Sequence, residues 1–390
     1  MRPDRLLVVA LVACLGGLAH RHAPRSGTAL ADRIDALLAG TFRPGDPGAV
    51  VLVRVRKTTL LHRAYGLARV SPAVPLELDS PLRIASITKA FTAVLVLQLA
   101  DAGRLSLDAS VGHYLGELSG PTADIPLRAL LQQRSGVRDF VELPERIDDR
   151  DWSFDDLVAR IGREPLVFPP GTRWAYSNSN YVLLAAVIER VTGQSYGAEL
   201  AARIFDPAGL TRARFPAPGL DGVDGHDADP AHEGGFVVAA LPHAPYNRGD
   251  GGIAATAGDV ARFAEALLSG RLLSPARLDE MLRDQERYGL GLFVDRLFGH
   301  RVVHHPGDWV GFSSALVTLP DDDVTVVLLS NRFQLRPRPE TLALRIAGMA
   351  ASLPVLEDLD VLLLLVMLVA GIALLLHHRR RGRRPTATGA

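Results

Sequence analysis

Strand-like segments stand at the two ends of a long helix-rich stretch. Runs rich in Val, Leu and Thr occupy 48–56 and 59–65, and further strand patterns return at 289–295, 301–304, 313–319 and 324–329. Such short β-branched runs bounded by turn residues are typical of strands. The simplest packing joins early and late strands in one antiparallel sheet, with the middle of the chain as a helical lobe beside it.

Helical patterns complete this α+β prediction. Helices at 29–39 and 339–350 are expected to flank the sheet, and an all-helical lobe is inserted at about 86–285. Tight turns are expected at 56–58 and 320–323, and a long loop at 214–250. The expected lobe helices lie at 86–102, 154–162, 180–191, 195–205, 257–268 and 274–283.

The first 31 residues are predicted to be a signal peptide or an uncleaved signal anchor. A charged start precedes an apolar run at 6–19, which is short for a spanning helix and typical of a signal-peptide core. A cleavage motif follows at 29–31. Lipidation at Cys14 stays an alternative.

The other end predicts a membrane span. The apolar run 361–376 is followed by HHRRRGRR. A basic cluster directly after an apolar run favours a stop in the membrane with that cluster in the cytoplasm. We therefore expect a transmembrane helix at 359–378, a basic cytoplasmic tail at 379–390, and the domain 32–350 outside the cytoplasm. A buried terminal helix is the alternative.

Charge and cysteine content narrow the partners. The formal net charge is zero, but the terminal segments hold an excess of arginine, so the body is mildly acidic. A nucleic-acid-binding protein is expected to show a basic face, and none is predicted here. The single cysteine, Cys14, lies outside the body, which therefore forms no disulfide.

Ser86 and Lys89 form the first candidate site. They lie three residues apart at the start of an apolar helical run, on one helix face. A serine hydroxyl needs a neighbouring base to act as a nucleophile, and arginine stays protonated. Lysine serves as a base once burial lowers its pKa. Lys89 is one of only two lysines in an arginine-rich chain, and the other, Lys57, lies in an expected turn.

Two later segments carry chemistry that suits this pair. Tyr176 and Asn178 lie in a loop before an amphipathic pattern, and a tyrosine beside a lysine can act as a base. His305 and Gly307 precede a strand pattern, where a glycine allows a ligand to approach the strand edge closely.

Together these stretches resemble the serine β-lactamase-like hydrolases, which include class C β-lactamases, D-Ala-D-Ala carboxypeptidases and related esterases. Residues 86–89 (SITK) look like the S-x-x-K motif. Residues 176–178 (YSN) look like Y-x-N, and 305–307 (HPG) like the H-x-G form of the third motif. Segments 134–137 (RSGV) and 251–259 (GGIAATAGD) resemble two further family stretches. The similarity covers about residues 30–350.

The resemblance implies an acyl-enzyme mechanism without a metal or organic cofactor. Ser86 is the expected nucleophile, and Lys89 and Tyr176 share the proton transfer. The backbone N–H groups of Ser86 and Asp308 would form the oxyanion hole. Asn178, His305 and Gly307 would bind a small-molecule or peptide substrate with an ester, amide or lactam carbonyl.

One departure shifts the expected substrate. His305 stands where classical β-lactamases and penicillin-binding enzymes usually carry lysine. A largely neutral imidazole binds a substrate carboxylate less well than lysine does. The leading hypothesis is therefore an esterase or peptidase. A β-lactamase or D,D-carboxypeptidase acting on penicillin or peptidoglycan, and an inactive cell-wall-binding protein, are the alternatives.

Two other patterns are interpreted as structural. Residues 193–197 (GQSYG) match G-x-S-x-G, but a helix rather than a strand precedes them, so Ser195 is expected to begin the next helix. His226 and His232 lie in a Gly- and Pro-rich loop with no element to hold metal geometry.

Overall fold

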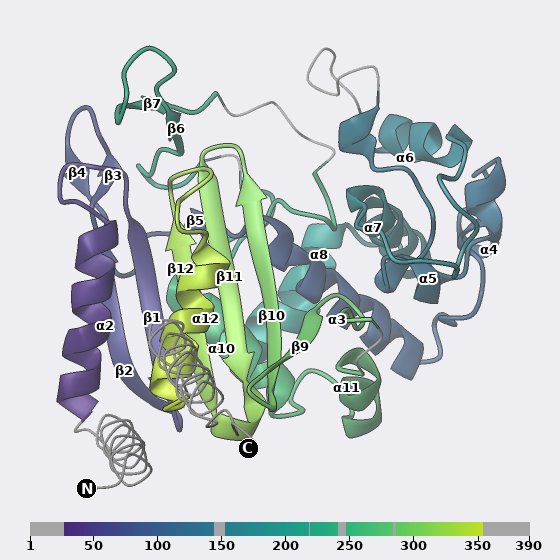
Figure 1. Ribbon diagram of the computed structural model, residues 1–390. Coiled ribbons are helices and arrows are strands. Elements are labelled where there is room, and N and C mark those ends of the chain that lie inside the picture. The colour runs from purple at the N-terminus through teal and green to yellow at the C-terminus, as the bar shows by residue number, and fades with distance from the viewer. Residues whose placement is uncertain (1–26, 144–152, 218, 241–246, 284–285, 354–390) are drawn as a thin grey trace, which may run out of the picture.

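A single large sheet joins the early and the late strands of the chain. The computed structural model describes residues 27–143, 153–217, 219–240, 247–283 and 286–353. The sheet is antiparallel, with strand order β2-β1-β12-β11-β10-β9, which fits the expected pairing of the two chain ends (Figure 1). Its strands are β1 Ala49–Val55, β2 Thr58–Tyr65, β9 Phe293–Leu297, β10 His300–Trp309, β11 Phe312–Leu319 and β12 Val324–Ser330.

Helices cover both faces of this sheet. α2 (Gly27–Thr41) and α12 (Pro339–Ala350) pack on one face, where Val51 and Val53 join their core. Val50 and Leu52 point to the other face and belong to the core shared with the helical lobe. Strand β1 therefore reads as a continuous apolar run, because successive side chains enter two different cores.

The lobe is built around a central helix, α3 (Thr88–Asp101), in which most residues are buried. It packs against α7 (Asn178–Thr192), and both belong to the larger core. The remaining helices on this side are α4 Val111–Tyr114, α5 Leu127–Leu131, α6 Phe154–Arg163, α8 Tyr196–Leu200, α9 Asp206–Ala208, α10 Ala257–Leu268 and α11 Pro275–Met281.

Short elements connect these layers. The strands pair as β3 Leu67–Arg69 with β4 Val74–Pro75, β5 Leu82–Arg83 with β8 Ala254–Ala255, and β6 His226–Ala228 with β7 Phe236–Val238. The 3₁₀ turns are η1 Ala85–Ile87, η2 Pro121–Asp124, η3 Phe140–Glu142 and η6 Pro320–Asp322, and η5 Ala201–Phe205 is a π-helical turn.

Several local expectations differ from the structure. The strand expected at 301–304 continues as β10 to Trp309, so His305 and Gly307 lie inside a strand and do not precede one. The helix expected at 86–102 is divided into the 3₁₀ turn η1 and α3. The stretch expected as a loop at 214–250 contains the β6–β7 hairpin. The helix expected at 195–205 ends in a π-helical turn, η5. Each difference is a change of backbone hydrogen bonding over a few residues, which side-chain periodicity does not register.

The predicted transmembrane helix and membrane location require correction. Among the residues that the structure describes, no helix combines the length and apolarity needed to span a bilayer. A span requires about 20 consecutive apolar residues, and the run at 361–376 is shorter. That run lies outside the described residues. The helix at 359–378, the cytoplasmic tail at 379–390 and the membrane localisation are therefore not supported.

The amino-terminal prediction lies mostly outside the described residues too. Residues 1–26, including Cys14, are not among them, and no signal segment is supported. Helix α2 begins at Gly27 and so contains the expected cleavage motif at 29–31.

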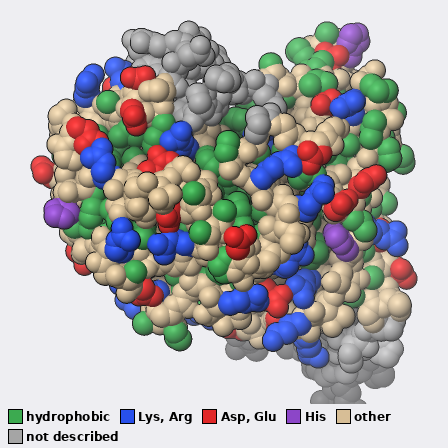
Figure 2. Space-filling model, turned by 180° about the vertical axis from the view of Figure 1, so that it is seen from behind, with side chains coloured by type: hydrophobic (Ala, Val, Ile, Leu, Met, Phe, Trp, Pro, Cys, Tyr) green, Lys and Arg blue, Asp and Glu red, His purple; other side chains and the backbone are tan. Residues whose placement is uncertain are grey.

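On the face shown in Figure 2, basic and acidic side chains are interspersed across the described part of the surface.

Strand β10 brings the sheet against the segment that carries Ser86. Strand β9 pairs with β10 only as far as His304, so the edge of β10 beyond this residue faces η1 instead. Gly307 makes the approach possible. A Cβ there would lie 2.5 Å from the carbonyl oxygen of Ile84 and 2.4 Å from Ser314 Oγ. The glycine thus sets the distance between sheet and lobe.

We expect Gly307→Ala to force β10 away from η1. Overpacking at a buried backbone contact costs about 1–3 kcal/mol of unfolding free energy. Urea denaturation measures this loss. Gly40→Ala is the matched control, because a Cβ at that exposed helix position meets nothing within 4 Å. Equal unfolding free energies of the two variants would show that the packing of β10 does not require a residue without a side chain at position 307.

Candidate active site

Ser86 lies in a strained turn at the base of a cavity. It occupies the middle of η1, immediately before α3, and its side chain stays partly exposed. Ala85 has a φ of 48°, a left-handed conformation that residues other than glycine seldom adopt. Such strain is concentrated at functional sites, where the surrounding packing maintains it.

Lys89 lies beneath Ser86 and is completely buried, with 0% exposure. Its Nζ lies 3.1 Å from Ser86 Oγ, 2.7 Å from Asn178 Oδ1 and 2.8 Å from the backbone oxygen of Asp250. The amide and backbone oxygens can only accept. They take two N–H bonds from Lys89 and leave its third position directed at the Ser86 hydroxyl.

Burial changes the protonation of this lysine. Removal from water lowers the pKa of Lys89 from 10.5 to about 8, while the negative charges of Asp250 and Asp139 act in the opposite direction. Desolvation therefore lowers the pKa of Lys89 by more than the two carboxylates raise it. A substantial fraction of Lys89 is neutral near pH 8 and able to accept a proton.

A buried polar network holds the loop that carries Tyr176 and the first turn of α7, which begins at Asn178. The side-chain oxygen of Gln133 accepts hydrogen bonds from Ser177 N at 2.9 Å and Asn180 Nδ2 at 2.6 Å. Ser135 donates to Asn180 Oδ1 at 2.5 Å. The segment 134–137 thus supports the loop from behind, because its buried groups find partners there.

Tyr176 faces both Ser86 and Lys89. Lys89 Nζ lies 4.9 Å from the centre of the Tyr176 ring. Burial raises the pKa of the Tyr176 hydroxyl well above its usual value, and a hydrogen bond with Ser86 only partly offsets this. The phenol is therefore protonated at neutral pH. This favours Lys89 over a tyrosinate as the group that takes the serine proton.

His305 forms the opposite wall from the edge of β10. It is 1% exposed, its Nδ1–H donates to the Pro306 carbonyl at 2.6 Å, and its Nε2 accepts from Tyr288 Oη at 3.3 Å. Burial, reinforced by the charge of Lys89, lowers the pKa of His305 to about 3. The imidazole is neutral at pH 7, as expected from the sequence.

Charged and aromatic side chains surround the lower rim. Asp308 accepts from Arg338 at 3.3 Å and from Ser313 Oγ at 2.7 Å. The Arg83 guanidinium lies 4.7 Å from the centre of the Trp309 ring. These contacts orient the Asp308 end of β10 at the mouth of the cavity.

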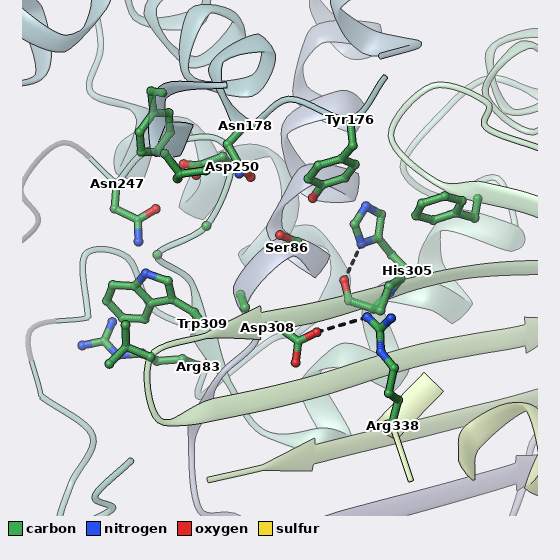
Figure 3. A pocket seen from close by; sticks show the side chains of 18 of the residues that line it. Arg83, Ser86, Tyr176, Asn178, Asn247, Asp250, His305, Asp308, Trp309 and Arg338 are labelled. Carbon is green, nitrogen blue, oxygen red and sulfur yellow. Dashed lines mark hydrogen bonds and ion pairs between the residues drawn. The ribbon is translucent and has the colours of Figure 1, made fainter. Parts of the chain in front are cut away.

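The cavity has a volume of about 930 Å³ and brings the predicted residues together (Figure 3). Ser86, Tyr176, Asn178, His305 and Asp308 line it, whereas Lys89 and Gly307 are buried next to it and are not among the lining residues. Its other lining residues are Arg83, Ala85, Phe140, Val141, Trp174, Asn247, Asp250, Gly251, Gly252, Phe293, Pro306, Trp309, Val310 and Arg338.

Sequence reasoning missed two carboxylates near Lys89. Asp139 accepts a hydrogen bond from Asn178 Nδ2 at 3.0 Å, and Asp250 lines the cavity. Single aspartates before a 3₁₀ turn or a glycine pair carry no recognisable signal. Ser195, in contrast, behaves as expected: it begins α8 and accepts from Ala198 N, away from the cavity.

Comparisons with known proteins extend over most of the chain. Penicillin-binding protein 4* of Bacillus subtilis (strain 168) is 28% identical over 70% of this chain. This chain spans 65% of that protein's length. Esterase EstB of Burkholderia gladioli is 33% identical over 66% of this chain and 74% of the esterase.

The structural comparison agrees. The D-stereospecific amidohydrolase from Streptomyces sp. superposes with a TM-score of 0.67 and 28% sequence identity, covering 80% of this chain and 95% of the amidohydrolase. The family model described as Beta-lactamase matches residues 30–350. Because this match extends over most of the chain, the chain belongs to the beta-lactamase family.

Proposed function

We propose that the chain hydrolyses ester or amide substrates through an acyl-enzyme on Ser86. The observation that carries this proposal is the hydrogen bonding of Lys89. Its Nζ is bound by two oxygens that only accept, which directs the remaining position at Ser86 Oγ, 3.1 Å away. A neutral amine in this position presents its lone pair to the hydroxyl proton.

The first half-reaction then follows from the arrangement. Ser86 Oγ forms a bond to the substrate carbonyl carbon while Lys89 takes its proton. The bond from that carbon to the leaving group breaks, and the leaving group departs with the proton held by Lys89, given directly or through the Tyr176 hydroxyl, which is reprotonated by Lys89. Water then forms a bond to the acyl carbon while neutral Lys89 takes its proton. The bond from Ser86 Oγ to the acyl carbon breaks, the acid leaves, and Lys89 returns the proton to Ser86 Oγ.

The strand edge supports binding of the reacting carbonyl. The backbone N–H groups of Ser86 and Asp308 would donate to the oxyanion, while Asn178, His305 and Gly307 would position the substrate. Because His305 is neutral, its side chain offers no positive charge to a substrate carboxylate, and Arg338 on the same side is paired with Asp308. The related esterase and amidohydrolase support the choice of ester or amide substrates.

The direct test is covalent labelling with a fluorophosphonate. The probe should attach to Ser86, as located by mass spectrometry of the labelled peptide. Ser86→Ala removes the nucleophile, so labelling and p-nitrophenyl ester hydrolysis should both disappear. Ser195→Ala is the control, because Ser195 only caps a helix, and it should keep both. Labelling that persists in Ser86→Ala would place the nucleophile elsewhere.

Lys89→Arg should abolish most of the activity while keeping a positive charge. A guanidinium cannot lose its proton at neutral pH, and general-base catalysis contributes about 10²–10⁴-fold. The value of kcat/KM for a neutral p-nitrophenyl ester measures the loss. Lys57→Arg changes the chain's other lysine, which is exposed, and should be neutral. Near-normal turnover by Lys89→Arg would remove lysine from the proton transfer.

The rate should rise with pH as Lys89 loses its proton. With a pKa lowered to about 8, the neutral amine becomes scarcer by about tenfold for each unit below that value. We expect kcat/KM for a neutral ester to increase from pH 6, to reach half of its maximum near pH 8, and to level off at higher pH. Ser86→Ala supplies the background of spontaneous hydrolysis. A profile that is flat over this range contradicts lysine as the base.

A further inference from the structure

Asp250 is a buried carboxylate on the wall of the cavity, and the mechanism above uses only its backbone oxygen. Its residue exposure is 8%, and it lies among the lining residues. The nearest donors to the carboxyl group are the backbone N–H groups of Asp250 itself and Gly251. Oδ1 has no hydrogen-bond partner within the described residues. Buried polar atoms are rarely left in this state without a reason.

The charge that faces Asp250 disappears when the enzyme is active. In the part of the chain that the structure describes, Lys89 is the cation that acts on this carboxyl, and Asp139 adds a like charge. The phenols of Tyr176 and Tyr196 nearby are neutral. Once Lys89 is neutral, as its role as a base requires, the two carboxylates have no cation between them. A buried charge without a partner is unfavourable.

Asp250 lies where a substrate in the cavity can reach its uncompensated negative charge. Figure 3 shows Asp250 beside Asn178 on one side of Ser86, while Asp308 lies on the other side. Lys89 Nζ touches both the Asp250 backbone and Ser86 Oγ, so only two hydrogen bonds separate them. Asn247 also lines this part of the cavity, and it offers an amide oxygen.

We propose that Asp250 binds a protonated amine of the substrate, close to the carbonyl that Ser86 attacks. The preferred substrates are then aminoacyl esters or amides with a free amino group. The ammonium supplies the charge that Lys89 loses and satisfies the carboxylate with a charge-assisted hydrogen bond. This proposal rests on the proposed function, because it assigns a substrate class to the same site.

A different role for Asp250 has different consequences. If the carboxylate only adjusted the protonation of Lys89, its loss would affect every substrate equally. Asp139 provides the comparison, since it also acts on Lys89 but is not among the lining residues. Binding of an ammonium by Asp250 affects only substrates that carry one.

The experiment compares methyl alaninate with methyl lactate, each as both enantiomers, by pH-stat titration at pH 7. The two esters differ in an ammonium against a hydroxyl group, and the α-amine is mostly protonated at this pH. In Asp250→Asn, kcat/KM for the preferred alaninate should fall by about 10- to 100-fold more than for lactate, mainly through KM. Asp139→Asn should change both esters by the same factor.

A second measurement needs no variant. Burial and Asp139 raise the pKa of Asp250 to about 6. The wild-type preference for alaninate over lactate should therefore decline from pH 7 to pH 5, as this carboxylate takes up a proton. The titration of Lys89 affects both esters and cancels in the ratio.

Each outcome decides one of the two proposals. Equal losses in Asp250→Asn, no loss at all, or a wild type that hydrolyses lactate without preferring alaninate overturns the role of Asp250. Lactate turnover by the variant shows that it is folded. A wild type whose Ser86 resists the fluorophosphonate and which hydrolyses no ester overturns the proposed function instead.

Discussion

The burial of one lysine amine is the constraint on which the site depends. Lys89 has no exposure, and Asn178, the Asp250 backbone and Ser86 surround its Nζ. A charged ammonium is costly in such a place, and a neutral amine is not. Packing of the lobe therefore lowers the pKa of the amine beneath the serine, which is the property that its proposed role as a base requires. The carboxylates nearby keep this effect moderate, so that the amine titrates close to neutral pH rather than far below it.

Packing of the sheet against the lobe completes the site. The lobe supplies Ser86, Lys89 and the loop with Tyr176, whereas the sheet supplies the free edge of β10. The two parts meet through atoms that leave no space for a side chain at Gly307. Such a contact makes the distance between serine and strand edge a property of the fold, and small changes there alter the alignment of reacting groups.

The charges in the cavity are divided between its walls. His305 on the strand side is neutral, and Asp308 is paired with Arg338. Across the cavity, Asp250 and Asp139 share one lysine, Lys89, which loses its charge as the pH rises through about 8. The lobe side of the cavity is thus negatively charged whenever Lys89 is neutral. Electrostatic asymmetry of this kind selects the charge and the orientation of a substrate.

The sequence alone indicated which segments pair and which residues make up the candidate site. Apolar runs with β-branched residues at both ends of the body are long enough to mark strands, and they pair as expected. Ser86 and Lys89 lie three residues apart, and this spacing places both side chains on one face of a helical turn, whatever the rest of the fold is. These properties depend on residues that are close together in the sequence, so the sequence alone is enough to recognise them.

Tertiary structure decided the protonation states of the site residues and which side chains surround them. The shift of Lys89, the neutrality of His305 and the protonated phenol of Tyr176 all arise from burial by segments far away in the chain. Asp139 and Asp250 become neighbours of Lys89 only after folding. Desolvation and charge proximity depend on distances in space, and the order of residues does not contain those distances.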